Sequence, residues 1–304
     1  MVLGSHTEIV TVGELKFNAM GDLNQYRCSC REEIRKCPFW DGITREMAGR
    51  GFPFDLNEVG TDFQSLGSGY AKFLLSPLHR GVFLEFLRDR GLSLSASWRR
   101  ESERIQAKNL ALLQSVATRS GKDVVVDSSK VAVRLKYLLR NPAIDVRIVR
   151  LVRDGRAVAL TYMDSFRFAD ASDPGLRGGG MGIRGEYDRL SMSEAALEWR
   201  LSNEEGENLL KGVERSRWME VRYETFCREP EKTANAIFKF IGVAPTEILA
   251  LFRTTVQHVV GNGMRLDSRR EIQLDERWRD VLRKEDLAVF ESIAGSLNRR
   301  LGYL

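Results

Sequence analysis

Four short runs of β-branched and aromatic residues, separated by helical patterns, constrain the fold of this chain more than any other feature. The runs cover residues 9–12 (IVTV), 124–126 (VVV), 146–152 (VRIVRLV) and 218–223 (WMEVRY). Each is short enough for a buried strand and is bounded by charge or glycine. Strands that alternate with helices form βαβ units, so the pattern predicts an α/β fold with a parallel sheet and helices on both faces.

The intervening segments carry helical spacing together with start and stop signals. The predicted helices cover residues 101–119, 131–140, 155–169, 191–210 and 230–241. Ser191 and Glu194 form a capping-box pair at the start of the fourth helix. Pro230 suits the first turn of the fifth helix, and Gly242 suits its C-cap.

The length of 304 residues fits one large α/β domain or two smaller ones. Residues 40–98 contain several glycines and show no clear strand period. We therefore expect a single domain over residues 1–304, with a mostly helical insertion at about residues 41–120.

Charge and hydropathy narrow the functional classes. Forty-seven Lys and Arg against 42 Asp and Glu give a net charge of +5, which suits an anionic ligand but is too small to indicate nucleic acid. No apolar run approaches the ~20 residues that span a bilayer. The first residues lack a basic region and place His6 and Glu8 where a signal peptide is apolar. We expect a cytoplasmic protein with no membrane span.

The third run leads into a polar turn that is suited to phosphate. Ligands of parallel sheets bind outside the carboxyl ends of the strands. Here Arg153 and Arg156 flank the start of a helix, whose free backbone N–H groups would also attract an anion. Thr161 would add a hydroxyl from the second helical turn. The alternative is a surface turn, with Asp154 capping the helix and both arginines in solvent.

Two more charged residues stand at predicted strand ends. Glu14 follows the first run, where a carboxylate could act as a general base. Lys130 follows the second run, where an ammonium group could neutralise charge on a transferring group. Both also fit ordinary surface positions.

Three of the four cysteines, Cys28, Cys30 and Cys37, lie within ten residues. A structural zinc site needs four ligands, and no histidine lies near these cysteines in the sequence. We therefore favour buried free thiols and expect no metal. His258 instead begins a glycine-containing loop that ends at Arg265 and could close over an anion.

Taken together, these stretches resemble the sulfotransferases that use 3′-phosphoadenosine 5′-phosphosulfate (PAPS), and most of all the bacterial family related to protein-tyrosine sulfotransferases. The matching stretches, in family order, are HTEIVTVGELKF, CSCREEIRKCPFW, VVVDSSK, IVRLVRDGRAVALTYM, AALEWRLSNEEGENLL, WMEVRYETFCREPEKTANAIFKFIGV and HVVGNGMRLD with LDERWR. They cover most of the chain outside residues 41–120. The resemblance implies a three-layer, P-loop-NTPase-like α/β fold and sulfuryl transfer from PAPS, as co-substrate, to a hydroxyl or amine.

The resemblance also implies roles for individual residues in binding the nucleotide. Arg153 and Thr161 match the arginine and serine that hold the 3′-phosphate, and threonine keeps the hydroxyl. Tyr223 matches a position near the adenosine. Residues 261–265 match a loop that closes over the 3′-phosphate, with Gly263 and Arg265 as expected contacts.

For catalysis, Glu14 matches the carboxylate that takes the proton of the acceptor, and Lys130 lies near the position of a lysine that assists at the sulfate. The physical requirements agree with these roles. Sulfuryl transfer needs two aligned reactants, donors for the charged oxygens and a base. No metal is required for these tasks.

One element of the family pattern is missing. The family begins with a buried strand and a loop that cradles the 5′-phosphosulfate, but this chain contains neither G-x-x-x-x-G-K-[ST] nor R-S-G-T. We therefore expect an N-terminally truncated form that lacks this first strand and loop. Loss of a central strand would leave backbone groups without partners, so we also expect low stability and little activity.

Two other functions remain open at this stage. One is a non-catalytic relative that binds the nucleotide without transferring sulfate, and the other is a small-molecule kinase on a similar fold. The acceptor is a small molecule, a carbohydrate or a peptide, and nucleic acid is not expected. The sequence indicates neither the acceptor nor the oligomeric state.

Overall fold

The computed structural model describes the chain except residues 17–19, 21–22, 57–58, 64–80, 181–188 and 268–270. The strands are β1 (Ile9–Gly13), β2 (Val124–Asp127), β3 (Ile148–Val152) and β4 (Trp218–Arg222). They coincide with the predicted runs, so these predictions are confirmed. β1 pairs with β2 and β3 pairs with β4, both in parallel. The described strands therefore form two parallel pairs, where we expected one continuous sheet.

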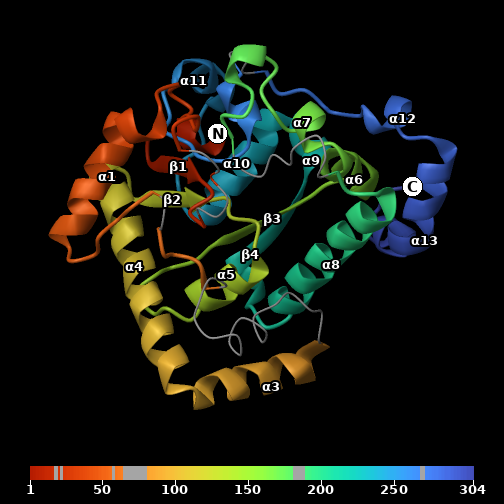
Figure 1. Ribbon diagram of the computed structural model, residues 1–304. Helices are drawn as coiled ribbons and strands as arrows, with labels where there is room; N and C mark the ends of the chain where they lie inside the picture. The colour runs from red at the N-terminus through yellow and green to blue at the C-terminus, as the bar shows by residue number, and fades with distance from the viewer. Residues whose placement is uncertain (17–19, 21–22, 57–58, 64–80, 181–188, 268–270) are drawn as a thin grey trace.

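Helices surround both pairs (Figure 1). They are α1 (Pro38–Gly49), α3 (Gly81–Leu94), α4 (Ala96–Ser120), α5 (Ala132–Leu138), α6 (Gly155–Met163), α7 (Ser165–Phe168), α8 (Met192–Leu210), α9 (Tyr223–Arg228), α10 (Pro230–Ile241), α11 (Ile248–Thr254), α12 (Trp278–Val281) and α13 (Lys284–Arg300). Helices α1, α3 and α4 cover most of the described part of the region expected to be a helical insertion. That this region is an insertion in a single domain stays a prediction.

The helix signals in the sequence act as expected, with one exception. Ser191 and Glu194 form both hydrogen bonds of a capping box at the start of α8. Gly242 ends α10 with a φ of 85°, in the left-handed region that favours glycine. The helix predicted over residues 155–169 is instead broken at Asp164, because its side chain accepts a hydrogen bond from the Arg167 backbone and starts α7.

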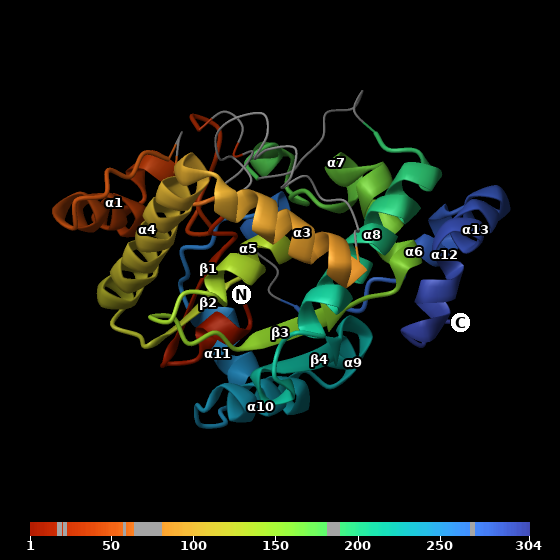
Figure 2. The same ribbon diagram turned by 90° about the horizontal axis from the view of Figure 1, so that it is seen from below.

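The β1–β2 pair has helices on both faces. Val10, Val12 and Val125 pack into a core with α1 and α4. Ile9 and Val124 contribute to a second core with α10 and α11. Successive side chains of a strand point to opposite faces, which explains how such short strands supply both cores. Figure 2 shows α4 and α10 on opposite sides of this pair.

A third core lies at the carboxyl end of β3, between α6, α8 and α13. Val152 packs there with Trp199 and Phe290. Gly155 lets α6 approach closely, since a Cβ at this position would lie 2.6 Å from the Phe290 ring and 2.8 Å from the Trp199 ring. This close packing fixes where the turn after β3 lies.

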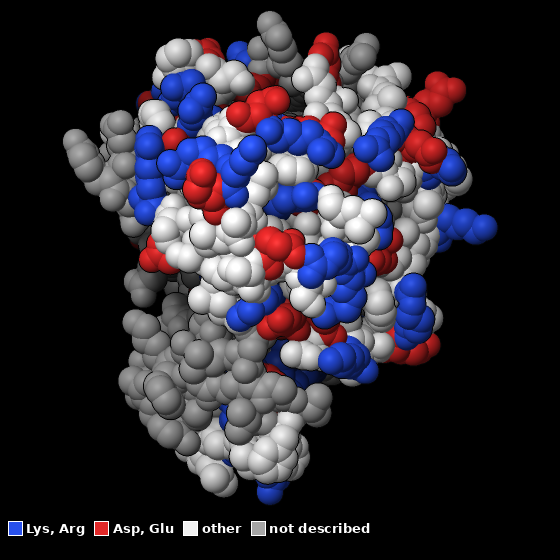
Figure 3. Space-filling view, turned by 90° about the vertical axis from the view of Figure 1, so that its right-hand side faces the viewer, with Lys and Arg blue, Asp and Glu red and all other residues white. Residues whose placement is uncertain are grey.

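Within the part of the chain that is described, no helix is long and apolar enough to cross a bilayer. The face that carries α12 and α13 shows blue and red side chains interspersed (Figure 3). The excess positive charge is therefore not gathered into a single-sign patch on this face.

Candidate functional site

One carboxylate ties together the loops that follow β1 and β2. Oδ1 of Asp127 accepts hydrogen bonds from the Leu15 backbone N–H at 3.2 Å and from the Ser129 backbone and hydroxyl at 2.9 and 2.6 Å. The Ser129 hydroxyl accepts in turn from the Lys16 N–H at 2.9 Å. The buried Arg134 holds the other oxygen of Asp127 at 2.9 Å. These bonds hold the two strand tips side by side.

The loop of residues 257–265 closes the other side of the β1 tip. The Val260 N–H donates to the Val12 carbonyl at 2.9 Å, and the Val260 carbonyl accepts from the Glu14 N–H at 3.3 Å. Gly13 lies between them with a φ of 85°, and a side chain there would overlap the Val260 carbonyl oxygen. Only glycine fits this close approach.

Glu14 and Lys130 meet at these tips. The Lys130 Nζ lies 2.9 Å from Oε1 of Glu14, and their side chains are 73% and 27% exposed for the lysine and the glutamate, respectively. An ideal Cβ on Gly261 would lie 4.0 Å from the same Glu14 oxygen, so the 257–265 loop borders the pair. The structure thus brings both predicted catalytic residues together. The lysine side chain is mostly exposed to solvent, so it has room to move.

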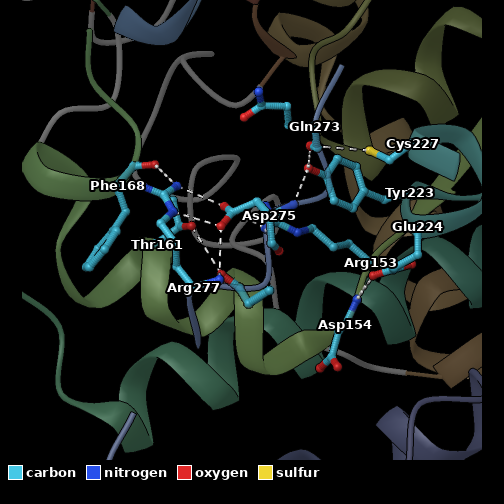
Figure 4. A network of polar contacts seen from close by, with 11 residues as sticks. Arg153, Asp154, Thr161, Phe168, Tyr223, Glu224, Cys227, Gln273, Asp275 and Arg277 are labelled. Carbon is cyan, nitrogen blue, oxygen red and sulfur yellow. Dashed lines mark hydrogen bonds and ion pairs between the residues drawn. The ribbon is translucent and has the colours of Figure 1, made fainter. Parts of the chain in front are cut away.

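A second polar network lies beyond β3 and β4 (Figure 4). Nη2 of Arg153 donates to the carboxylate of Asp275 at 2.9 Å, and Arg277 binds the same carboxylate at 2.7 and 2.8 Å. Bonds from Arg277 first, and then from Arg153, hold the pKa of Asp275 well below its usual range. The Arg153 guanidinium also lies 4.5 Å from the ring centre of Tyr223, whose pKa is raised to about 12, chiefly by burial. The Tyr223 hydroxyl donates to the Gln273 carbonyl at 3.1 Å.

The expectation that the α6 N-terminus offers free N–H groups to a phosphate is wrong. The Asp154 N–H donates to Glu224 at 3.1 Å, and the Gly155 N–H donates to Asn298 at 2.9 Å. The Arg156 N–H is capped by the Asp154 side chain at 3.0 Å. Two of these donors are satisfied by side chains from distant elements, which the local sequence does not show, and the third is satisfied by the Asp154 cap, the alternative that the sequence offered.

The other two candidates in this segment, Arg156 and Thr161, contact other groups of the protein. Arg156 donates to the Leu304 carbonyl at 2.8 Å, and its guanidinium lies 4.0 Å from the ring centre of Trp278. The Thr161 hydroxyl donates to the Ala157 carbonyl at 3.2 Å within α6. Figure 4 draws Thr161 in the same close-up as the Arg153 network.

The buried side chain of Arg265 stabilises the 257–265 loop by hydrogen bonds to its backbone. It is 7% exposed, and its guanidinium lies 4.8 Å from the ring centre of Tyr26. Its donors reach the carbonyl groups of Arg27, Gly179, Val259, Gly261 and Asn262. Gly263 is also buried, and a Cβ there would overlap the Asp170 carboxylate. In this arrangement Arg265 shapes the loop, and a direct contact with phosphate stays a prediction.

His258 joins Cys28, Cys30 and Cys37. The four ligand atoms all lie within 4.8 Å of one another. The sequence argument that no histidine is available to these cysteines is therefore wrong. Residue 258 is far from residues 28–37 along the chain, but the fold brings it into contact with them.

The comparisons with known proteins agree with these observations. Residues 3–247 match the family model described as "Sulfotransferase family". The chain belongs to the sulfotransferase family. This membership confirms the family-level resemblance seen in the sequence.

Several known proteins are similar to this sulfotransferase. It is 30% identical to human carbohydrate sulfotransferase 6 over 173 residues, which covers 55% of this chain and 44% of that protein. It is 24% identical to mouse carbohydrate sulfotransferase 2 over 200 residues, which covers 56% of this chain and 37% of that protein. The matches thus span less than half the length of these relatives. The sulfotransferase domain from the Curacin biosynthetic pathway aligns with a TM-score of 0.46 at 16% identity, over 100% of this chain and 92% of that one.

Sequence reasoning missed two residues of this sulfotransferase's second network. Asp275 and Arg277 belong to LDERWR, a stretch that resembles the family but received no role. The contact of Asp275 with Arg153 links positions more than 120 residues apart, so local patterns could not reveal it. The network makes them part of the candidate site.

Proposed function

We propose that this sulfotransferase moves a sulfuryl group from PAPS to a hydroxyl group, with Glu14 as the base. The observation that carries the proposal is the Glu14–Lys130 pair, 2.9 Å apart at the carboxyl ends of two parallel strands. A carboxylate and an ammonium group at that edge supply a proton acceptor and a charge donor for one reaction. Membership of the family supports the same chemistry.

The second network fits the phosphate end of such a donor. Arg153 and Arg277 converge on one carboxylate, the kind of anion for which a forked guanidinium is suited. The Nε of Arg153 is buried and makes no hydrogen bond within the described residues. We infer that Asp275 occupies the place of a phosphate oxygen, and that Arg153, with Arg277, binds the 3′-phosphate when Asp275 turns away. Tyr223, stacked on Arg153, is then positioned to contact the adenine or ribose.

The proposed reaction breaks the sulfur–oxygen bond to the 5′-phosphate and forms a bond from the acceptor oxygen to sulfur. Glu14 takes the proton of the attacking hydroxyl. Lys130 leaves its contact with Glu14 and donates to the sulfuryl or leaving oxygens, where charge develops. The 73% exposure of the lysine side chain permits this movement.

Several relatives are named as carbohydrate sulfotransferases. This supports a saccharide hydroxyl as the acceptor of this chain. A cytoplasmic location, expected from the sequence, stays a prediction.

The test separates binding from transfer. Purified protein is titrated calorimetrically with adenosine 3′,5′-bisphosphate, and turnover is measured with radiolabelled PAPS and a panel of saccharides. Glu14→Gln is expected to lower kcat by roughly 10²–10⁴-fold, the usual contribution of a positioned base, with bisphosphate affinity unchanged. Glu8→Gln, an exposed glutamate just before the same strand, is the matched control.

Each outcome is informative. Binding of the bisphosphate without turnover by the unaltered protein would replace transfer with nucleotide binding alone, the result expected if the chain lacks the loop for the 5′-phosphosulfate. Binding of ATP in preference to the bisphosphate would favour a kinase. Equal turnover by Glu14→Gln and the unaltered protein would remove Glu14 from the mechanism.

A further inference from the structure

Three thiols and an imidazole form a cluster that the proposed reaction does not use. Cys28, Cys30, Cys37 and His258 place one ligand atom each within 4.8 Å of all the others. Cys28 and Cys37 have no exposed surface, and Cys30 and His258 are half-buried. We propose that these four side chains bind a structural zinc ion.

Three of the six separations between ligand atoms lie close to those of tetrahedral coordination, and all six are within 4.8 Å. Zinc–sulfur bonds of about 2.3 Å and zinc–nitrogen bonds of about 2.0 Å imply edges of about 3.8 Å between sulfurs and about 3.5 Å from sulfur to nitrogen. The Cys30 and Cys37 sulfurs lie 3.7 Å apart. Nδ1 of His258 lies 3.2 Å from the Cys37 sulfur and 3.8 Å from the Cys28 sulfur. The 3.7 Å between sulfurs is also far longer than a disulfide bond of about 2.05 Å.

The backbone forms a tight turn that aims the first two thiols at one point. The Cys28 N–H donates to the Glu32 carbonyl at 2.9 Å, and the Arg31 N–H donates to the Cys28 carbonyl at 2.7 Å. Arg31 has a φ of 73°, the one non-glycine residue with positive φ among the described residues. Such strain persists where surrounding structure holds it, and here it lies between the ligand positions.

Ser29 holds the histidine segment in place. Its hydroxyl donates to the Gln257 carbonyl at 2.5 Å and accepts from the Val259 N–H at 2.8 Å. Its own N–H donates to the Val259 carbonyl at 3.1 Å. These buried bonds flank residue 258 on both sides, and the Phe39 ring lies parallel to the imidazole with centres 4.9 Å apart. The fourth ligand is therefore fixed before any metal arrives.

Backbone N–H groups face the three sulfurs. Backbone N–H groups of Cys30, Glu32 and Trp40 donate to the sulfurs of Cys28, Cys30 and Cys37, respectively. Cys37 is also the residue that precedes α1, where the helix dipole stabilises negative charge. Each sulfur thus has a donor that would remain in place with the metal bound.

The type and number of the ligands indicate zinc rather than another metal ion. Three soft thiolates and one imidazole within tetrahedral distances are typical of zinc, and four protein ligands leave no open position for substrate. Binding would release the protons of the thiols to solvent. Four basic residues nearby in the sequence (Arg27, Arg31, Arg35 and Lys36) outnumber the two acidic ones (Glu32 and Glu33), and their excess would offset the net negative charge of the site. Such an ion would link residues 28–37 to the loop that borders Glu14.

The first measurement is the metal content of the unaltered protein, expressed with zinc in the medium and purified without chelator or metal affinity resin. Inductively coupled plasma mass spectrometry is expected to measure about one zinc ion per protein chain. Exchange for cobalt(II) is expected to produce the strong visible absorption of tetrahedral cobalt with thiolate charge transfer. Neither the zinc content nor the cobalt spectrum depends on enzymatic activity, so the zinc proposal is tested separately from the proposed reaction.

Variants locate the ion. Cys37→Ser and His258→Gln are each expected to reduce zinc content at least tenfold. Cys227→Ser and His6→Gln are matched controls outside the cluster and are expected to keep the metal. Zinc-free unaltered protein with four titratable thiols would overturn the proposal. So would a Cys30–Cys37 disulfide, iron in place of zinc, or zinc retained by both cluster variants.

Discussion

At the scale of single residues, the candidate site depends on charged groups that are already paired with one another. Lys130 contacts Glu14, and Arg153 and Arg277 contact Asp275. A ligand must therefore exchange one ionic partner for another. This arrangement keeps the charges satisfied when no ligand is bound, and it makes Asp275 a competitor of any anion that Arg153 would bind.

The Asp275 contacts predict how stability depends on pH. The folded state holds the pKa of Asp275 below the ordinary value of 3.8, so the stabilisation is complete above that pH and is lost as the pH falls further. Between pH 6 and pH 3, we expect the free energy of unfolding in urea to fall by about 1 kcal/mol more for the unaltered protein than for Asp275→Asn. Equal losses in both proteins would show that this carboxylate does not contribute.

At the scale of elements, the sequence predicts strands well and their partners poorly. Residues 9–12 and 124–126 read as strands because β-branched runs bounded by charge suit few other structures. Which strands pair is decided by distant segments, so the four runs themselves do not show that β2 and β3 are unpaired in the described residues; the expected loss of a central strand is the sequence argument that bears on it. The same limit applies to the site. Glu14 and Lys130 stand at readable strand ends, whereas the placement of Asp275 needs the fold.

The packing of α6 gives a test at this scale. Gly155→Ala would place a Cβ 2.6 Å from the Phe290 ring, and we expect a loss of about 1–3 kcal/mol in the free energy of unfolding. Gly206→Ala is the matched control, because Gly206 lies inside α8 and a Cβ added there would meet no atom within 4 Å. We expect that control to gain about 0.5–1 kcal/mol. A neutral Gly155→Ala would contradict the close packing of α6.

At the scale of the whole molecule, the net charge is only +5, and one face mixes side chains of both signs. Figure 3 shows this on the face that carries α12 and α13. Nucleic acid is held by neutralising many phosphates at once, which requires a continuous basic surface. Small anions need only a few converging groups, such as Arg153 with Arg277.

This difference predicts selectivity. In 0.15 M salt, fluorescence anisotropy is expected to show no binding of a labelled DNA duplex or single strand at about 10 μM protein, a concentration at which a non-specific DNA-binding protein with a Kd of about 10⁻⁶ M would be largely bound. Adenosine 3′,5′-bisphosphate is expected to bind under the same conditions. Saturable binding of DNA in this range would point to a basic surface elsewhere on the molecule.

The contact between Gly13 and Val260 has a consequence for how this protein tolerates variation. The backbone of residue 260 lies against the tip of β1, so positions nearly 250 residues apart form one structural unit. In a saturation mutagenesis library selected for folded protein, the positions that lose most of their substitutions would not be neighbours along the gene. Position 13 would reject every side chain, and second-site suppressors of mild defects at its neighbouring positions would map to codons 257–265.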